Sequence, residues 1–417
     1  MLSIIQVLPL FLPNCNLNIN ICLPQNMYPK IIGYYTSWSI YDRNFLPTDV
    51  RVSKLTHINY AFAKIEDGKI AMSDPWADAE KPYCENENIL GSYGQFNEPD
   101  GPVRKANPNI RVLISIGGWS FSQYFSVVAS THENRETFSK SVADFVEKYK
   151  FDGVDIDWEF PVVEGHEHNI RSPDDGKNFS LLVESLKKAL GPKRTQYNES
   201  YLLTLATSAA PNSYNHLEIG KLARFVDWFN IMAYDFTGPW SDVCHHHCNL
   251  LTDTKNPNHL SADKAIYDYI SSGARNDQIV LGVPFYGRGF SNVHCGTKES
   301  SRPHKNVGLG NSFKGLPSGK SEKGVFQFHE LFQNHLTSIG ETQGSSTLWH
   351  RIWNDELKSV NLWNSKTKEF ISYEDNQSIA WKCYHVKSNG LGGIMIWELY
   401  GDHDGHLLDS VVQGFTC

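Results

Sequence analysis

The sequence predicts an α/β fold, a (β/α)8 or TIM barrel that carries a small α+β insertion domain. Eight short apolar segments recur along the 417 residues, and stretches with helical periodicity lie between them. Strands that alternate with helices are typical of a parallel sheet, and eight such units can close into a barrel ringed by helices. One long gap between the last two apolar segments predicts the insertion.

The eight apolar segments are the predicted strands of the barrel. In chain order they are Ile31–Tyr35, His57–Ala63, Arg111–Ile116, Gly153–Trp158, Leu202–Thr207, Phe225–Met232, Ile279–Phe285 and Gly393–Trp397. In this fold, the residues that carry chemistry are expected where a strand ends and the next loop begins.

Three of the intervening segments carry clear helix signals. The stretch Ser130-Thr-His-Glu133 fits a capping box before a helix that runs to about Lys150. Helical patterns also extend from Asp174 to Leu190 and from Ser261 to Ser272. We expect these helices to cover the outside of the barrel.

The gap between the seventh and eighth strands spans roughly 100 residues, several times a usual crossover connection. Residues 291–380 are first rich in Gly, Ser and Lys and then aromatic, and they are too long for a structureless loop. We expect them to form the insertion and to line the groove at the barrel mouth, with residues 30–290 and 381–417 as the barrel domain. Only twenty residues follow the last strand, so no further module is expected there.

The composition is that of an ordinary globular protein, with 40% hydrophobic and 20% charged residues. Aromatic residues at 12%, eleven of them Trp, suit either sugar binding or a large core. The formal net charge of −8 disfavours nucleic acid as a partner, because phosphate binding needs clustered Lys and Arg. No apolar run reaches the roughly 20 residues that span a membrane. We therefore expect a monomer that contacts neither nucleic acid nor membrane.

The first 23 residues have part of the pattern of a secretion signal. Leu2–Leu12 resembles its apolar segment, although Pro9 and Pro13 interrupt the run, and neither a basic start nor a small-residue cleavage site is evident. A divergent start of the chain is the alternative. We expect residues 1–23 to be a leader and the protein to be extracellular.

Cysteines and N-x-Ser triplets are compatible with secretion. Removal of a leader that carries Cys15 and Cys22 would leave six cysteines, an even number that permits disulfides without requiring them. Asn178, Asn198 and Asn376 each begin an N-x-Ser triplet, a glycosylation signal that also occurs by chance.

The most informative segment is the fourth predicted strand, which lies within Phe151-Asp-Gly-Val-Asp-Ile-Asp-Trp-Glu-Phe-Pro161. Alternate residues of a strand share a face, so Asp155, Asp157 and Glu159 point inward and the apolar residues between them point toward the helices. Three acids this close cannot all ionise, so at least one pKa is raised, as a general acid requires. A metal site or a polar plug of the barrel is the alternative.

The run D-G-x-D-x-D-x-E resembles the signature of family 18 glycoside hydrolases, the chitinases, and this resemblance disfavours the metal site and the plug. Other segments resemble motifs of the same family in the same order. They are Ser115-Ile-Gly-Gly-Trp119, Met232-Ala-Tyr-Asp235, Pro284-Phe-Tyr-Gly-Arg288 and Gly393-Ile-Met-Ile-Trp397. The resemblance covers about residues 30–415, and it includes the position of the late insertion.

The resemblance implies hydrolysis of β-1,4-linked N-acetylglucosamine polymers with retention, in which the substrate assists. Glu159 would protonate the glycosidic oxygen and then activate water. The acetamido carbonyl of the sugar in subsite −1 would attack its own anomeric carbon and give an oxazolinium ion. Asp157 would orient the acetamido group and Asp155 would share a proton with Asp157, while Tyr234 would bind the acetamido oxygen and Asp235 the sugar near the acid.

The resemblance also assigns substrate-binding positions. They are Trp119, Trp397, Asp235, Met232, Tyr34, Phe62 and Arg288. Trp397 would form the floor of subsite −1 and Trp119 would stack in subsite +1. For all but Asp235, packing in the core is the alternative role, and for Arg288 a structural ion pair is another. Neither a cofactor nor a metal is expected at the site.

The run Cys244-His-His-His-Cys248 allows three interpretations. Cys and His are zinc ligands, but three successive His cannot all face one ion. The other two are a small disulfide loop and an ordinary solvated loop, and the solvated loop is the expectation.

Two other functions remain as alternatives on the same scaffold. One is a catalytically inactive chitin-binding lectin, which would lack the acid that Glu159 supplies. The other is an endo-N-acetylglucosaminidase that acts on N-glycans, which usually lacks the full aromatic lining and the late insertion.

Overall fold

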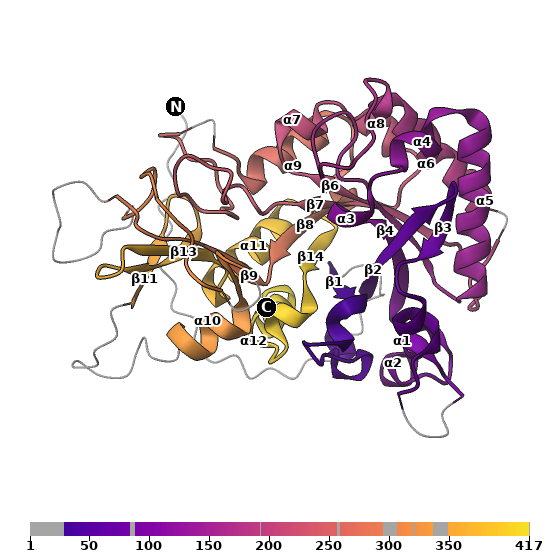
Figure 1. The fold of residues 1–417 in the computed structure, drawn as a ribbon, viewed down its shortest axis with the longest axis horizontal. Helices are drawn as coiled ribbons and strands as arrows, with labels where there is room; N and C mark the ends of the chain where they lie inside the picture. The colour runs from indigo at the N-terminus through magenta and orange to yellow at the C-terminus, as the bar shows by residue number, and fades with distance from the viewer. Residues whose placement is uncertain are drawn as a thin grey trace.

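The computed structural model describes residues 29–83, 88–191, 193–256, 259–294, 307–319, 322–336 and 349–416. In this part of the chain, helices surround a barrel, and a second sheet lies beside it (Figure 1). The leader predicted at residues 1–23 lies outside the described residues. So do five cysteines, which are Cys15, Cys22, Cys84, Cys295 and Cys417.

The barrel consists of eight parallel strands. They are β1 (Lys30–Thr36), β2 (His57–Glu66), β4 (Arg111–Gly117), β5 (Gly153–Asp157), β6 (Leu202–Ser208), β7 (Trp228–Met232), β8 (Ile279–Pro284) and β14 (Gly393–Trp397). Strand β1 pairs with β2 on one side and with β14 on the other, which closes the ring. A short antiparallel strand, β3 (Lys69–Met72), pairs with the end of β2. The predicted (β/α)8 barrel is confirmed.

The strand that starts furthest from its prediction is β7, which begins at Trp228 rather than at Phe225. The N–H groups of Phe225 and Val226 donate to the carbonyl of Leu222, so the turn that ends α8 (Ile219–Leu222) continues through them. Both side chains pack against the core from that turn, which explains why their apolar character resembled a strand.

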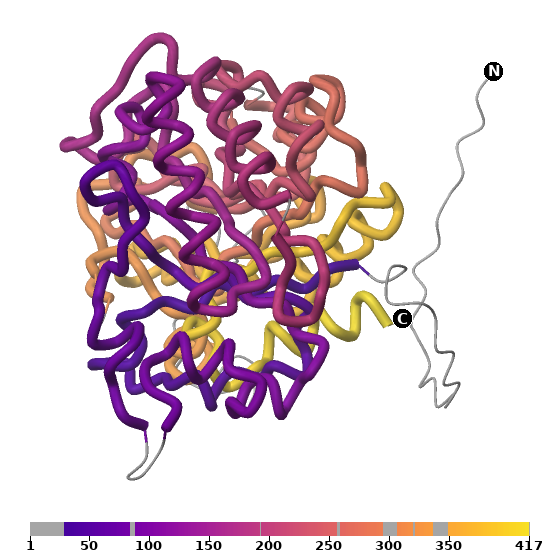
Figure 2. Tube along the Cα trace, turned by 90° about the vertical axis from the view of Figure 1, so that its right-hand side faces the viewer, coloured from indigo at the N-terminus to yellow at the C-terminus, as the bar shows by residue number. Residues whose placement is uncertain are grey.

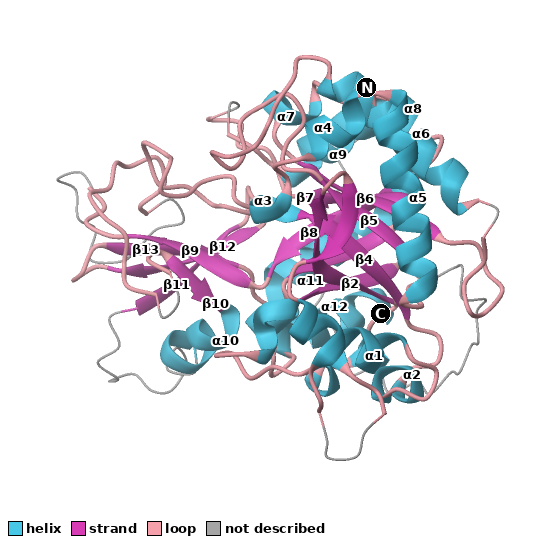
Figure 3. Cartoon of the chain, turned by 45° about the vertical axis from the view of Figure 1, so that its right-hand side comes forward, coloured by secondary structure: helices cyan, strands magenta, loops and turns pink. Residues whose placement is uncertain are grey.

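Helices cover the outside of the barrel (Figure 3). Those of ten or more residues are α5 (His132–Lys148), α6 (Asp175–Leu190), α9 (Ala262–Ser271), α11 (Asn376–Ser388) and α12 (His406–Thr416). The shorter ones are α1 (Gly91–Asn97), α2 (Pro102–Ala106), α3 (Gly118–Phe121), α4 (Phe125–Ser130), α7 (Pro211–Tyr214) and α8, while α10 (Phe328–Leu331) lies beside the second sheet. Within the described residues, no helix has both the length and the apolar character to span a membrane.

Helix α5 begins one residue after the start that the capping box predicts. The N-cap is Thr131, whose hydroxyl oxygen accepts a hydrogen bond from the N–H of Asn134. The hydroxyl of Ser130 donates instead to the carbonyl of Val127, so Ser130 belongs to the end of α4.

The second sheet lies beside the mouth of the barrel (Figure 3). Its strands are β9 (Tyr286–Phe290), β10 (Val325–Gln327), β11 (Trp349–Asn354), β12 (Ser359–Asn364) and β13 (Glu369–Tyr373), in the order β10-β9-β13-β12-β11. All pairs are antiparallel, and the sheet has its own apolar cluster around Phe290, Trp363 and Phe370. Since β9 starts two residues after β8 ends, the barrel continues almost directly into this sheet.

The first and last strands of the barrel lie side by side, and Figure 2 shows their indigo and yellow segments close together. At the mouth, the hydroxyl of Thr36 donates to Oε2 of Glu398 at 2.9 Å. The guanidinium of Arg43 pairs with the other oxygen of the same carboxylate at 2.7 Å. These contacts join the end of β1 to the residue that follows β14.

Candidate active site

A cavity of about 880 Å³ opens at the mouth of the barrel, where the strands end. Its wall is formed by the ends of barrel strands and the loops that follow them, together with strand β9 of the second sheet. Ten of the residues predicted for the site line it, namely Tyr34, Phe62, Trp119, Asp157, Glu159, Met232, Tyr234, Asp235, Arg288 and Trp397. Asp155, the remaining one, lies one inward position further down β5.

Strand β5 alternates as the sequence predicts. Asp155 is fully buried and Asp157 is 3% exposed, while Glu159 lies just beyond the strand and is half-buried. The apolar residues between the acids pack in the outer core, where Trp158 stacks on Phe125 with ring centroids 5.4 Å apart. The strand therefore delivers an acidic row to the barrel interior and an apolar row to the helices.

Four donors from four other strands hold the carboxyl group of Asp155. The hydroxyls of Tyr34 and Ser115 donate to Oδ2 at 2.7 and 2.8 Å. The hydroxyl of Thr204 and the amide of Asn230 donate to Oδ1 at 2.6 and 3.1 Å. Burial raises the pKa of Asp155, and these hydrogen bonds oppose that increase.

The carboxyl group of Asp157 has a different environment. Its Oδ1 atom is buried and has no hydrogen-bond partner among the described residues. Burial raises the pKa of Asp157 well above its usual range, and the nearby Glu159 and Asp155 raise it further, which favours the protonated form. Asp155 and Asp157 share no hydrogen bond in the described structure, so the predicted transfer of a proton between them stays a prediction.

The backbone of Glu159 is fixed on both sides. Its N–H donates to the hydroxyl oxygen of Ser122 at 2.9 Å, and its carbonyl accepts from the amide of Asn169 at 2.6 Å. Burial raises the pKa of Glu159 to about 8, and the charge of Asp235 contributes in the same direction. Glu159 therefore holds a proton at neutral pH in a cavity wall, which is the condition for a general acid.

Asp235 is held by strand β9 of the second sheet. The guanidinium of Arg288 donates from Nε to Oδ1 at 2.6 Å and from Nη2 to Oδ2 at 2.8 Å, and the hydroxyl of Tyr286 donates to Oδ1 at 2.7 Å. Burial alone would raise the pKa of Asp235, but Arg288 and, to a smaller extent, His247 together outweigh burial and hold it well below the usual range. Arg288 thus forms a structural ion pair, the alternative role considered for it from the sequence. Its partner, Asp235, is itself a predicted site residue.

Tyr234 lies beside Asp235 at the end of β7, and its hydroxyl approaches the sulfur of Met395 at 3.9 Å. Burial raises the pKa of Tyr234 well above its usual value, and the surrounding carboxylates add to this increase. Its side chain therefore remains a neutral phenol that can donate a hydrogen bond into the cavity.

Trp397, at the end of β14, is supported by two other predicted residues. The ring of Phe62 stacks on it with centroids 5.7 Å apart and planes 22° apart, and the ring of Tyr34 lies 5.4 Å away. Tyr34 and Phe62 are only 1% and 6% exposed, whereas Trp397 is half-buried. The two covered rings thus fix the orientation of the ring that faces the cavity.

Trp119 lies at the rim of the cavity and is 52% exposed, so its ring is not a core residue. Gly117 and Gly118 position it after β4 with φ values of 109° and 69°, which glycine adopts readily. A Cβ atom at Gly118 would come within 2.5 Å of the ring of Phe62. The two glycines therefore allow the chain to turn directly over the floor of the site.

Sequence reasoning missed several residues around the cavity. Trp38 and Trp240 also line it and are 37% and 62% exposed. Thr204 and Asn230 are polar residues at inward positions of otherwise apolar strands. Because buried polar groups need hydrogen-bond partners, this pattern could have identified them as partners of the acidic row. Nothing in the sequence indicated that Ser122 would anchor Glu159.

The run Cys244–Cys248 is neither a solvated nor a disulfide-closed loop, so both of these interpretations are wrong. Cys248 is a free, buried thiol, and His246 and His247 are fully buried. The loop is covered because it packs between the barrel and the second sheet, where the N–H of His247 donates to Ser372 of β13. Within the described ranges, no group of three or more Cys, His, Asp or Glu side chains could hold a metal ion.

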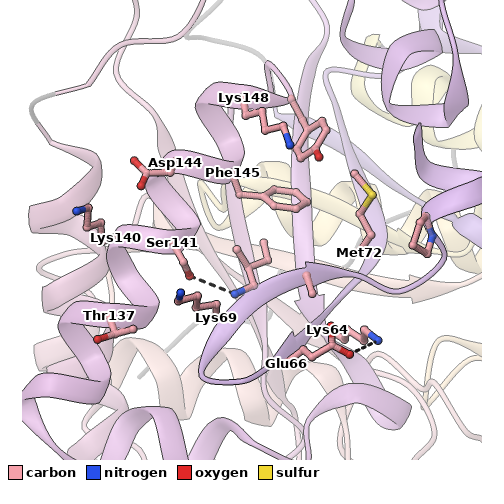
Figure 4. A pocket seen from close by; sticks show the side chains of 14 residues that line it. Lys64, Glu66, Lys69, Met72, Thr137, Lys140, Ser141, Asp144, Phe145 and Lys148 are labelled. Carbon is pink, nitrogen blue, oxygen red and sulfur yellow. Dashed lines mark hydrogen bonds and ion pairs between the residues drawn. The ribbon is translucent and has the colours of Figure 1, made fainter. Parts of the chain in front are cut away.

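A second cavity of about 840 Å³ lies on the outside of the barrel, between the β2–β3 hairpin and α5 (Figure 4). Its rim carries four lysines and two acids, and the pair Lys64–Glu66 is 2.8 Å apart. It contains none of the predicted site residues, so the chemistry belongs to the cavity at the barrel mouth.

The cavity at the barrel mouth combines a protonated glutamic acid, a buried acidic row beneath it and a lining of tryptophan rings. Acid-catalysed cleavage of glycosidic bonds requires the first feature, and sugar rings stack on the last. The fold and the site define a glycosidase.

The chain belongs to the family described as "Glycosyl hydrolases family 18", whose profile matches residues 30–402. It is 35% identical over 423 residues to Chitinase A1 of Niallia circulans, covering 92% of this chain and 58% of that protein. It is 33% identical over 388 residues to Chitinase 1 of Aphanocladium album, covering 91% and 83%. The structure of chitinase ChiA74 from Bacillus thuringiensis, 30% identical, superposes with a TM-score of 0.79 and covers 93% of this chain and 70% of that one.

Proposed function

We propose that this protein is a chitinase that hydrolyses β-1,4-linked N-acetylglucosamine polymers and oligomers with retention, through substrate assistance. The observation that carries the proposal is the placement of the two carboxyl groups next to Glu159. Asp157 is only 3% exposed and lies on β5 one inward position below Glu159, and Asp235 is bound by Arg288 and Tyr286. Neither is free to attack an anomeric carbon, so the acetamido group of the substrate is the available nucleophile.

In the first step, Glu159 gives its proton to the glycosidic oxygen while the bond from that oxygen to the anomeric carbon breaks. The acetamido carbonyl oxygen forms a new bond to the anomeric carbon, which gives the oxazolinium ion. In the second step, water attacks the anomeric carbon, its proton passes to Glu159, and the bond to the acetamido oxygen breaks. A nucleophile carried by the substrate has an effective molarity on the order of 10⁵–10⁸ M.

The other residues of the cavity bind and orient the sugar in this proposal. Asp157 accepts the acetamido N–H when it is ionised and stabilises the positive intermediate, and Asp155 shares its proton. Tyr234 donates to the acetamido oxygen, and Asp235 contacts the sugar beside the acid. Trp397 forms the floor of subsite −1 and Trp119 stacks in subsite +1. Met232, Tyr34, Phe62 and Arg288 complete the wall or support it.

The two alternatives are less well supported. A lectin would not need Glu159 with a pKa raised to about 8, and an enzyme for N-glycans would not need the additional exposed rings of Trp38 and Trp240. We also propose that residues 291–380, joined by strand β9, form an insertion domain on the groove. We propose further that the enzyme is a monomer and that residues 1–23 are a leader that directs it out of the cell.

A time course of products from N-acetylglucosamine hexamer tests the proposal. Progressive release of shorter oligomers supports a chitinase, and the order of products reports endo or exo action and the preferred chain end. Binding of the hexamer without cleavage would support the lectin. Cleavage of an N-glycan core in preference to the hexamer would support the endo-N-acetylglucosaminidase.

A further inference from the structure

The His-rich loop packs directly behind Asp235. The N–H of Phe236, the residue after Asp235, donates to the carbonyl of His247 at 3.0 Å, so the loop folds back onto the end of β7. The N–H of His247 donates to the hydroxyl oxygen of Ser372 at 3.0 Å. In the second sheet, Ser372 of β13 is the register partner of Arg288 of β9. The backbone of His247 is therefore hydrogen-bonded both to the end of β7, which carries Asp235, and to β13, which pairs with the strand that carries Arg288.

The ring of His247 is fully buried and faces the carboxyl group of Asp235. Its Nδ1 atom lies 3.6 Å from Oδ1 of Asp235, and its centroid is 5.3 Å from that of Tyr286. The charged or titratable groups around it are Asp235, Tyr286, Arg288, Glu374 and the neighbouring His246. Oδ1 is also the atom that accepts from Tyr286 and from Nε of Arg288.

Burial lowers the pKa of His247, so the imidazole is neutral at neutral pH and carries one N–H. A buried N–H that makes no hydrogen bond is costly, and the carboxylate of Asp235 is the acceptor that its Nδ1 faces. The 3.6 Å separation of Nδ1 and Oδ1 lies just beyond hydrogen-bond range, and catalytic hydrogen bonds commonly shorten when substrate binds.

We propose that His247 is a positioning residue that acts through Asp235. It supplies a neutral donor from the side opposite the cavity and, together with Arg288 and Tyr286, fixes the carboxylate beside Glu159. This inference rests on the proposed function, since it assigns Asp235 a role in the chemistry. It also gives a role to a His-rich loop that is buried between the barrel and the second sheet.

Three substitutions separate this role from packing. In His247→Asn the amide nitrogen occupies the place of Nδ1, in His247→Gln it occupies the place of Nε2, and His247→Phe keeps the ring without a donor. We expect His247→Asn to retain kcat on the hexamer within about threefold, and the other two to lose about tenfold or more, the scale of a displaced catalytic group. Loss of a donor also raises the pKa of Asp235, so the acid limb of the kcat profile moves to higher pH.

Asp235→Asn and His246→Phe complete the experiment. If His247 acts through Asp235, the double variant Asp235→Asn/His247→Gln loses no more activity than Asp235→Asn alone. His246→Phe changes an equally buried ring that lies against Phe370, and we expect a lower melting temperature with an unchanged pH profile.

Equal activity and equal acid limbs for His247→Asn and His247→Gln would overturn the inference, whether or not His247→Phe folds. So would losses that multiply in the double variant. A wild-type protein that fails to cleave the hexamer contradicts the proposed function instead, which keeps the two failures distinct.

Discussion

The hydroxyl of Tyr34 donates a 2.7 Å hydrogen bond to Oδ2 of Asp155, which joins the end of β1 to the middle of β5 across the barrel interior. The same ring lies 5.4 Å from the ring of Trp397. One side chain thus connects the base of the acidic row to the aromatic floor of the site. Removing its hydroxyl oxygen would abolish the hydrogen bond to Asp155 and keep the ring contact with Trp397.

Tyr34→Phe keeps the ring and removes the hydroxyl. We expect kcat on the hexamer to fall by about tenfold, because a lost hydrogen bond to a charged group costs about 1.5–3 kcal/mol, part of which the other three donors to Asp155 recover. KM should change little, since Trp397 keeps its support. Tyr35→Phe is the matched control, because its hydroxyl bonds the carbonyl of Phe45 outside the site. An equal loss in both variants would mean that the barrel, rather than Asp155, is affected.

Glu159→Gln should fold, bind chitin oligomers and lose nearly all turnover. A general acid or base contributes about 10²- to 10⁴-fold to a rate, and here one residue serves both steps. Calorimetric titration with hexamer and a product assay measure the two properties on the same sample. Glu164→Gln, on the exposed rim of the same cavity, is the control. If Glu159→Gln kept activity within tenfold of the parent, Glu159 would not be the general acid.

The pH profile should report the raised pKa of Glu159. A general acid must be protonated in the free enzyme, so kcat/KM should fall as the pH rises through about 8. Asp235→Asn removes a negative charge that raises this pKa, so the basic limb should move to lower pH. The movement should be partial, because burial is the larger cause. A basic limb that does not move, or that moves upward, contradicts the electrostatic link between the two carboxyl groups.

Trp119→Ala should weaken oligomer binding and leave the fold intact, because its ring is 52% exposed. We expect a higher KM and dissociation constant with a smaller change in kcat, since stacking takes no part in bond making. Trp158→Ala provides the contrast, as that ring is 2% exposed and stacked on Phe125. It should destabilise the protein by about 3–5 kcal/mol in a denaturation experiment. If the two variants were equally destabilised, Trp119 would have a structural role.

The stereochemistry of the product tests substrate assistance directly. Two inversions at the anomeric carbon give net retention, so NMR of early products should show the β-anomer. Cellulose oligomers should be inert, and partly deacetylated chitin should be cut only where an acetylated sugar occupies subsite −1. Initial α-anomer, or efficient cleavage with glucosamine in that subsite, would return the nucleophilic role to a protein group or to water.

How far the sequence predicts the structure depends on whether a feature is local. The acidic row of β5 follows from alternation within five residues, and the barrel follows from recurring apolar segments. The contact between His247 and Asp235 does not, because the loop is buried by segments distant in the sequence, such as strands β9 and β13. The same applies to Ser122, whose hydroxyl meets Glu159 only after the chain has turned at Gly117. Pairwise contacts between distant segments carry no periodic signal in one sequence.

The pairing of β1 with β14 has a consequence for the order of events during biosynthesis. The Thr36–Glu398 hydrogen bond joins groups 362 residues apart, and at bacterial or eukaryotic synthesis rates that distance takes roughly 20–70 s to translate. Until then, the nascent chain holds an acidic row and seven barrel strands with an open seam, without the aromatic floor that Trp397 provides. The two unpaired strand edges at that seam would leave backbone N–H and C=O groups open to pairing with other chains, and a chain truncated before β14 would keep them.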